Sequence, residues 1–307
     1  MKKAFLSFLL AGMLFCTSNL NAQKLTVATY NIRNDNSGDI SNGNGWAQRC
    51  PVICKMIQFH DFDIFGAQEV LHGQLTDMLG ALPGYAYIGV GRDDGKEKGE
   101  YAPVFYKEAK FKLLGSGHFW LSEVTDKPNK GWDAVLPRIC TWGRFQDKES
   151  GFRFCFFNLH MDHIGVEARK QSAKLVLSKI KDWCGVEPVI LTGDFNVDQR
   201  SESYALINTS GKLQDAYDIS KIRYALNGTF NNFDPNIKTD SRIDHIFVTS
   251  DFRVARYGVL TDTYRISAGN TKEIKSGNFP SEVSFQQHLA RVPSDHFPVE
   301  VMLDYSK

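Results

Sequence analysis

The chain has 307 residues, and its 36 lysines and arginines nearly balance its 35 aspartates and glutamates, which gives a formal net charge of +1. Nucleic-acid-binding domains usually show a basic face or a high pI, so this balance disfavours such a domain, although a local basic patch stays open. A chain of this length can bury a large core, as one big domain or two smaller ones.

Residues 1–22 have the pattern of a secretory signal peptide. A basic start, Met1-Lys2-Lys3, precedes an apolar run that ends at Cys16 and a polar, small-residue segment that ends at Ala22. The apolar run is shorter than the roughly 20 residues of a membrane-spanning helix. We expect cleavage after Ala22, export to the periplasm or the medium, and no stable membrane span. Lipid attachment at Cys16 is the less favoured alternative, because Phe15 is bulkier than the small residue expected before a lipidated cysteine.

Residues 23–307 alternate strand and helix patterns with no linker of distinct composition, which predicts a single α/β domain. Strand patterns cover residues 25–31, 63–67, 85–90, 102–106, 152–159, 189–192, 243–249 and 297–303, and helix patterns cover residues 46–59, 71–80 and 166–183. Segments 152–159 and 189–192 are nearly continuous apolar runs, typical of strands covered on both faces. We expect polar loops at 34–44 and 91–99, the second of them mobile.

Six polar motifs lie at or beside the ends of these strands. In chain order they are Thr29-Tyr30-Asn31, Gln68-Glu69-Val70, Asn158-Leu159-His160, Gly193-Asp194-Phe195-Asn196, Arg242-Ile243-Asp244-His245 and Ser294-Asp295-His296. Loops carried by a rigid scaffold are where binding and catalytic residues concentrate. The motifs therefore predict one site, built on loops at one edge of the sheets.

The first, second and fourth motifs have the chemistry of a metal centre with a bound water. A carboxylate and an amide oxygen, here Glu69 and Asn31, with several waters are ligands that Mg²⁺ accepts. Asp194 and Asn196 are two residues apart, so in extended geometry both side chains point to one side. They can then orient a water and hydrogen-bond a phosphoryl oxygen. The alternatives are ordinary polar strand ends for the first pair and a turn for the second.

The histidine motifs can stabilise charge at the same edge. His160 can donate to a phosphate oxygen or protonate a leaving group, or together with Asp162 and His163 it can ligate a transition metal. Asp244 and His296 are 52 residues apart, and if they meet, the carboxylate favours one tautomer and the protonated form of the imidazole. The alternatives are a histidine that caps a strand end and an ion pair between Asp244 and a neighbouring cation.

The sequence holds no Gly-x-Ser-x-Gly motif, no P-loop and no Gly-x-Gly-x-x-Gly motif before a helix. A serine nucleophile and these nucleotide-binding loops are therefore excluded. What remains is attack by water with the help of a hard metal ion.

As an ordered set, the six motifs resemble those of the endonuclease/exonuclease/phosphatase superfamily, the DNase I-like metal-dependent phosphohydrolases. The resemblance covers the mature chain from Asn31 to His296. Segments 99–106, 119–122 and 137–142 are similar to a bacterial exported branch. The resemblance to the superfamily implies a four-layer α/β sandwich, in which two mixed β-sheets pack face to face with helices on the outside. It also implies a Mg²⁺ or Mn²⁺ cofactor.

The resemblance also implies roles for the motif residues. The implied metal ligands are Asn31, Glu69 and Asp295, and the implied catalytic residues are His160, Asp194, Asn196, Asp244 and His296. Asp194 would position or deprotonate the attacking water, and His296, charged through Asp244, would stabilise the transition state. Whether Asp194 or His296 is the base stays open.

We therefore expect an exported, monomeric phosphoric ester hydrolase that acts on a small phosphoester such as a sugar phosphate or a nucleotide. Candidate substrate contacts are Arg92, Arg138 and Arg144 for a second anionic group, and Tyr101, Trp132 and Trp142 for stacking under a ring. Surface arginines near aromatic residues are common, so an ordinary surface is the alternative for each. Two other functions stay open: a secreted nuclease or phosphodiesterase, which needs a basic groove, and a non-catalytic phosphoester-binding protein.

Overall fold

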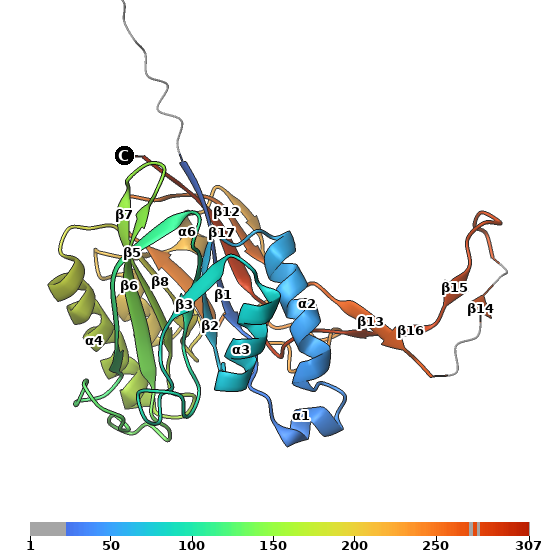
Figure 1. The fold of residues 1–307 in the computed structure, drawn as a ribbon, viewed down its shortest axis with the longest axis horizontal. Coiled ribbons are helices and arrows are strands. Elements are labelled where there is room, and N and C mark those ends of the chain that lie inside the picture. Colours follow the sequence, from blue (N-terminus) through green and yellow to red (C-terminus); the bar gives the residue numbers. More distant parts are fainter. Residues whose placement is uncertain (1–22, 270–272, 275–276, 307) are drawn as a thin grey trace, which may run out of the picture.

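The computed structural model describes residues 23–269, 273–274 and 277–306 (Figure 1). The predicted signal peptide, including Cys16, lies outside the described residues. Among the described helices, none is long and apolar enough to cross a membrane.

Two large mixed sheets form the centre of the molecule. The first has the order β10 (Ile222–Tyr224), β12 (Arg253–Val259), β17 (Val299–Tyr305), β1 (Gln23–Asn31), β2 (Ile64–Gln68), β4 (Val104–Lys107), β3 (Tyr85–Ile88). The second has the order β5 (Phe111–Trp120), β6 (Ile139–Asp147), β7 (Arg153–His160), β8 (Val189–Asp194), β11 (Asp244–Val248), β9 (Gln214–Asp215). In each sheet the central pair, β1–β2 or β7–β8, is parallel, and its outer neighbours run antiparallel to it.

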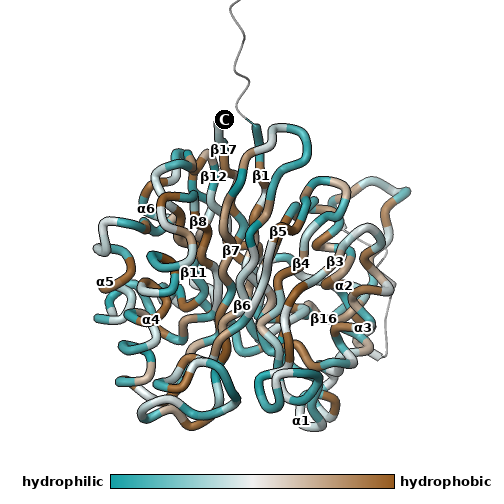
Figure 2. Tube along the Cα trace, turned by 60° about the vertical axis from the view of Figure 1, so that its left-hand side comes forward, coloured by the Kyte–Doolittle hydropathy of each residue, from teal (hydrophilic) through white to brown (hydrophobic). Residues whose placement is uncertain are grey.

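The two sheets bury one face of each against the other, and helices cover the outer faces. Apolar side chains of both sheets share one core cluster, for example Val27 and Ile64 with Phe156 and Ile190. The helices α2 (Trp46–Phe59) and α3 (His72–Ala81) pack on the outer face of the first sheet. The helices α4 (Val166–Cys184) and α5 (Glu202–Asn208) pack on the outer face of the second. The predicted four-layer α/β sandwich is confirmed, and Figure 2 shows apolar residues along its central strands.

A β-hairpin arm projects away from the sandwich (Figure 1). Its root pairs β13 (Tyr264–Ser267) with β16 (His288–Arg291), and its outer part pairs β14 (Glu273–Ile274) with β15 (Phe285–Gln286). The sequence patterns did not predict the arm, nor strands β5, β6 and β12.

One of the two loop predictions needs correction. The segment 34–44 contains the short helix α1 (Ser37–Ser41), which begins where Asn36 accepts a hydrogen bond from the Asp39 backbone N–H. The segment 91–99 is a loop, as predicted, and backbone hydrogen bonds close it from Gly91 to Lys96 and from Asp93 to Lys98, while its mobility stays a prediction. The helix α6 (Ala216–Ile219) completes the described helices.

Candidate active site

The sheet topology brings all six motifs to one edge of the sandwich. The parallel pair β1–β2 ends at Asn31 and Gln68, directly before Glu69, and the parallel pair β7–β8 ends at His160 and Asp194. The strands β11 and β17 run antiparallel to these pairs. Their motifs therefore lie at the N-terminal ends of the two strands, at the same edge. This edge lies opposite the edge from which β1 starts and at which β17 ends (Figure 1).

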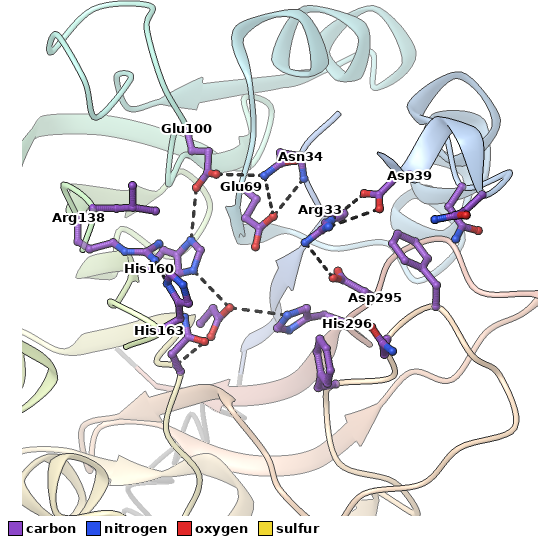
Figure 3. A pocket seen from close by; sticks show the side chains of 18 of the residues that line it. Arg33, Asn34, Asp39, Glu69, Glu100, Arg138, His160, His163, Asp295 and His296 are labelled. Carbon is purple, nitrogen blue, oxygen red and sulfur yellow. Dashed lines mark hydrogen bonds and ion pairs between the residues drawn. The ribbon is translucent and has the colours of Figure 1, made fainter. Parts of the chain in front are cut away.

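The pocket at this edge has a volume of about 690 Å³ and is lined mainly by polar residues. The lining includes five carboxylates (Asp39, Glu69, Glu100, Asp194 and Asp295), three arginines (Arg33, Arg138 and Arg291) and three histidines (His160, His163 and His296). Figure 3 shows Arg138 and His160 on one side of the pocket and Arg33 and Asp39 on the other.

The side chains of Asp244, His296 and Asp194 lie in a row that leads from the interior to the pocket. The Nδ1 atom of His296 lies 2.9 Å from Oδ2 of the buried Asp244, and its Nε2 atom lies 3.8 Å from Oδ2 of Asp194. Burial by itself lowers the pKa of His296, but the negative charge of Asp244, and then that of Asp194, raises it well above its ordinary value. The raised pKa favours the imidazolium form of His296, and its Nε2 atom faces Asp194.

Asp194 is held at the centre of the pocket by two donors. Its Oδ2 accepts a hydrogen bond of 3.0 Å from the Asn31 amide, and its Oδ1 accepts one of 2.9 Å from the backbone N–H of Asn196. Burial, and next the negative charge of Asp244, raises the pKa of Asp194 to about 7. A general base works best with a pKa near the operating pH, so Asp194 has the acidity that this role requires.

Glu69 lies across the pocket from His296 and is fixed by two asparagines. Its Oε1 accepts a 3.0 Å hydrogen bond from the Asn31 amide, and its Oε2 accepts bonds from the backbone and side-chain nitrogens of Asn34. Glu69 has a φ of 59° and Asn196 a φ of 51°, a left-handed conformation that is uncommon for residues other than glycine. Such backbone strain concentrates at functional sites, where the surrounding structure holds it.

Asn31, a predicted metal ligand, lies between two carboxylates of the site. Its carbonyl oxygen accepts a hydrogen bond from the backbone N–H of Arg33, and its amide nitrogen faces both Glu69 and Asp194. In this orientation Asn31 presents a donor to the two carboxylates and positions them, and its place in the metal site stays a prediction.

The donor set of Glu69 and Asp295 fits a hard divalent cation. Burial, opposed by His296 and then reinforced by Glu69, raises the pKa of Asp295. The pocket lining carries five carboxylates against three guanidiniums, so it stays net negative even with His296 protonated. A bound cation would relieve this excess. Arg33, with Nη1 3.4 Å from Asp295, offsets only part of it, because it also pairs with Asp39.

A second group of potential ligand atoms in the described chain comprises Asp194, Asp244 and His296, whose ligand atoms lie within 4.8 Å of one another. These residue types can bind metal. However, Nδ1 of His296 is bonded to Asp244, and the raised pKa of the imidazole favours its protonated form, which offers no lone pair. We therefore interpret this group as a proton relay.

His160 contributes a neutral imidazole to the same centre. Burial, reinforced by Arg138 and Arg92, lowers the pKa of His160 well below its ordinary value. Its Nε2 lies 3.6 Å from Asp194 and its Nδ1 3.9 Å from Glu100, so neither contact is an ion pair at neutral pH. A neutral ring with a free N–H can donate to a phosphate oxygen.

The predicted substrate contacts separate into two groups. Arg138 lines the pocket, where its Nη2 lies 2.9 Å from Nδ1 of His163 and its Nε donates to Asp162. Arg92 is buried behind the pocket wall and pairs with Glu100, which itself faces the pocket. Arg138 thus lies in the pocket lining, whereas Arg92 is linked to the lining by its ion pair with Glu100.

The aromatic candidates lie outside the pocket and are reassigned to packing. Tyr101 is buried under α3, with its hydroxyl 3.1 Å from His72. Trp142 packs against Phe157 and Trp183 beneath α4. Arg144 and Trp132 also lie elsewhere: Arg144 pairs with Glu187, and the Trp132 backbone N–H bonds Glu123.

Sequence reasoning missed the residues that hold the pocket loops. Arg49 of α2 is completely buried, and its guanidinium donates to five backbone carbonyls, those of Ile32, Arg33, Asn34, Asn44 and Pro293. It ties together the loop after β1, the start of α2 and the loop before His296. An arginine in a helix carries no signal in sequence that marks such a role.

The sequence profile described as "Endonuclease/Exonuclease/phosphatase family" matches residues 28–296. The chain belongs to this family. The match spans every motif at the sheet edge, from Asn31 to His296, so the family's phosphoesterase fold and the site described above coincide.

Solved structures of related proteins agree with membership of this family. A family protein of Bacteroides thetaiotaomicron is 57% identical, with a TM-score of 0.86 over 93% of this chain and 99% of that one. A mannosyl-6-phosphatase of the same organism is 58% identical, with a TM-score of 0.84 over 91% and 99% of the two chains. A family protein of Bacteroides vulgatus is 39% identical, with a TM-score of 0.79 over 92% and 100%.

Proposed function

We propose that this protein is an exported, divalent-metal-dependent phosphatase that hydrolyses small phosphorylated sugars. The observation that carries the proposal is the buried row of side chains Asp244, His296 and Asp194. This row ends at a pocket whose wall also contains Glu69 and Asp295. The likeness to a mannosyl-6-phosphatase supports the choice of substrate class.

The reaction is addition of water to phosphorus with loss of the alcohol. A new P–O bond forms from the water, the ester P–O bond breaks, and the alcohol leaves with one proton, which yields inorganic phosphate. Asp194, with its pKa near 7, takes a proton from the attacking water. His296 is protonated and acts as a charge-stabilising donor rather than as the base.

The remaining side chains orient the phosphoryl group. Asn196 is anchored by its amide to the Met161 carbonyl at 3.1 Å, and its second amide hydrogen is free for a phosphoryl oxygen. Neutral His160, at the end of the neighbouring strand β7, donates to the phosphoryl group from beside Asp194. Glu69 and Asp295 would hold Mg²⁺ or Mn²⁺, which supplies Lewis-acid neutralisation of phosphoryl charge when bound.

The charge of the pocket favours a small ester over a nucleic acid. Its lining has more carboxylates than arginines, and the chain without residues 1–22 loses two of its 36 basic residues, leaving 34 against 35 acidic ones. A nuclease neutralises several backbone phosphates with lysine and arginine, which this surface does not favour. A non-catalytic phosphoester-binding protein is disfavoured because Asp244, His296 and Asp194, the groups of the proton relay, are all present.

The test is phosphate release from mannose 6-phosphate, glucose 6-phosphate, AMP and a bis-aryl phosphodiester, with Mg²⁺, Mn²⁺ or EDTA. The proposal expects turnover of a sugar monoester that EDTA abolishes and added metal restores. Faster turnover of the diester, or turnover that persists in EDTA, would contradict it.

A further inference from the structure

The pocket continues beyond the catalytic centre into a region that none of the proposed catalytic steps uses. This region, here called the distal subsite, is lined by Asn42, Asn44, Phe230, Asn232, Phe233 and Arg291. It lies on the side of Asp39, because the Asn44 backbone N–H bonds the Asp39 carbonyl at 2.8 Å. Asparagine and arginine side chains with two phenyl rings form a mixed polar and aromatic lining.

Arg291 reaches the pocket from the root of the arm, on β16. Its Nη1 lies 3.2 Å from the Asn44 side-chain oxygen and 3.5 Å from the Asn42 carbonyl. Arg33 and Arg138, the other two arginines of the lining, each pair with a carboxylate, whereas Arg291 has no carboxylate partner among the described residues. Its remaining N–H donors are thus available to a ligand.

The wall of the distal subsite that residues 230–233 form is tied to the catalytic residues. The backbone N–H groups of Asn231 and Asn232 both donate to the Asp295 carbonyl, at 2.7 and 3.2 Å. The Phe230 ring packs edge-on against His296, with centroids 5.2 Å apart, although 39% of Phe230 is exposed. A leaving group on the phosphate held by His296 would therefore meet this wall first.

The backbone of this wall is strained, which fixes its side chains. Asn232 and Phe233 are consecutive left-handed residues, with φ of 50° and 60°. The Asn231 side-chain oxygen accepts from the Phe233 backbone N–H at 2.8 Å, and Arg49 lies 5.7 Å from the Phe233 ring. Two adjacent strained residues persist only when surrounding contacts hold them, as is common at ligand-binding loops.

We propose that the distal subsite binds the leaving group of the substrate and selects a polyhydroxylated ring. A sugar hydroxyl both donates and accepts, and an asparagine amide offers both functions, while a guanidinium offers only donors. Aromatic rings such as Phe230 provide an apolar wall for the C–H face of the ring. Arg291 and Asn232 are then specificity residues that the arm and the 229–234 segment contribute. This inference rests on the proposed function for the reaction itself.

The test compares two phosphate monoesters with the same ring size and an alkyl leaving group. Mannose 6-phosphate carries ring hydroxyls, and cyclohexylmethyl phosphate carries none. For wild type, kcat/KM is measured for both with saturating Mg²⁺, and the ratio of the two values is the readout. Variants are Arg291→Ala, Arg291→Lys and Asn232→Ala, and Arg265→Ala is the matched control, since Arg265 is an exposed arginine of the same hairpin whose side chain bonds Thr263.

We expect wild type to prefer the sugar ester, and Arg291→Ala to lower the ratio about tenfold or more, mainly through KM, as loss of one charged hydrogen bond does. Arg265→Ala should keep the wild-type ratio. An unchanged ratio in Arg291→Ala and Asn232→Ala, with wild type turning over both esters, would overturn the subsite and leave the proposed function standing. Turnover of neither ester by wild type would overturn the proposed function and the subsite together.

Discussion

The Nδ1 atom of His296 and Oδ2 of Asp244 are 2.9 Å apart, and both side chains are buried at the sheet edge. Asp244 begins β11 and pairs in register with Asp194, the last residue of β8. The pairing of two antiparallel strands therefore places one carboxylate behind the imidazole and the other in front of it. This arrangement makes the charge of His296 depend on Asp244.

Replacement of Asp244 by asparagine should shift the alkaline limb of the pH–activity profile to lower pH. Asp244 raises the pKa of His296, so the imidazolium persists to higher pH and is lost as pH rises through that raised value. In Asp244→Asn the imidazolium should be lost at a lower pH. The measurement is kcat/KM from about pH 5 to pH 10, with NMR titration of the His296 ring. Asp240→Asn, at an exposed aspartate, is the control, and an unmoved alkaline limb would argue against the coupling.

Replacement of Glu69 by glutamine should weaken Mn²⁺ binding by tenfold or more, because Glu69 is one of two carboxylates assigned to the cation. Isothermal titration of the chelator-treated protein with Mn²⁺ measures the effect without reference to turnover. Glu97→Gln, at an exposed glutamate of the 91–99 turn, should bind as wild type does. Equal affinities in the two variants would remove Glu69 from the metal site.

Replacement of Arg49 by leucine should lower the free energy of unfolding by at least about 3 kcal/mol, because it leaves several buried carbonyls without a donor. Urea unfolding followed by circular dichroism measures this change. Arg153→Leu, at an exposed arginine of β7, is the comparison and should change stability little. A small effect of Arg49→Leu would mean that water reaches those carbonyls.

Gly66→Ala should destabilise the protein by about 2 kcal/mol or more, because a Cβ there would overlap the Asn158 side-chain oxygen. Asn158 links the sheets by donating to the Ala67 and Pro103 carbonyls, so it has little freedom to move. Gly80→Ala in α3 meets no atom and should instead stabilise by about 0.5–1 kcal/mol. Thermal unfolding of both variants tests the pair, and a stable Gly66→Ala protein would show that the interface adapts.

Much of the fold could be predicted from sequence because its central strands are short apolar runs with polar ends. The predicted helix 46–59 coincides with α2, and the strands that deliver Glu69, His160 and Asp194 lie within one or two residues of their expected limits. These polar ends meet because parallel strands end at one edge. The strand patterns, the polar motifs at their ends and the family resemblance together therefore predicted where most of the candidate site lies.

The remaining errors come from tertiary packing that local patterns do not encode. Trp142 lies on β6, a strand that the patterns missed, where alternation places it on the face covered by α4 with Cys140. Tyr101 follows a polar turn, yet it is buried. Arg291 and Asn44 meet across 247 residues, and no spacing rule in the sequence relates a hairpin root to the start of α2.

The central claim is that Asp194 activates the attacking water, and phosphate release by Asp194→Ala tests it most directly. With mannose 6-phosphate and saturating Mg²⁺, kcat should fall by about 10²–10³ or more while circular dichroism and the melting temperature stay close to wild type. Asp240→Ala, which removes an exposed carboxylate, should retain wild-type kcat. A folded Asp194→Ala protein with near-normal kcat would contradict the assignment of Asp194 and the mechanism built on it.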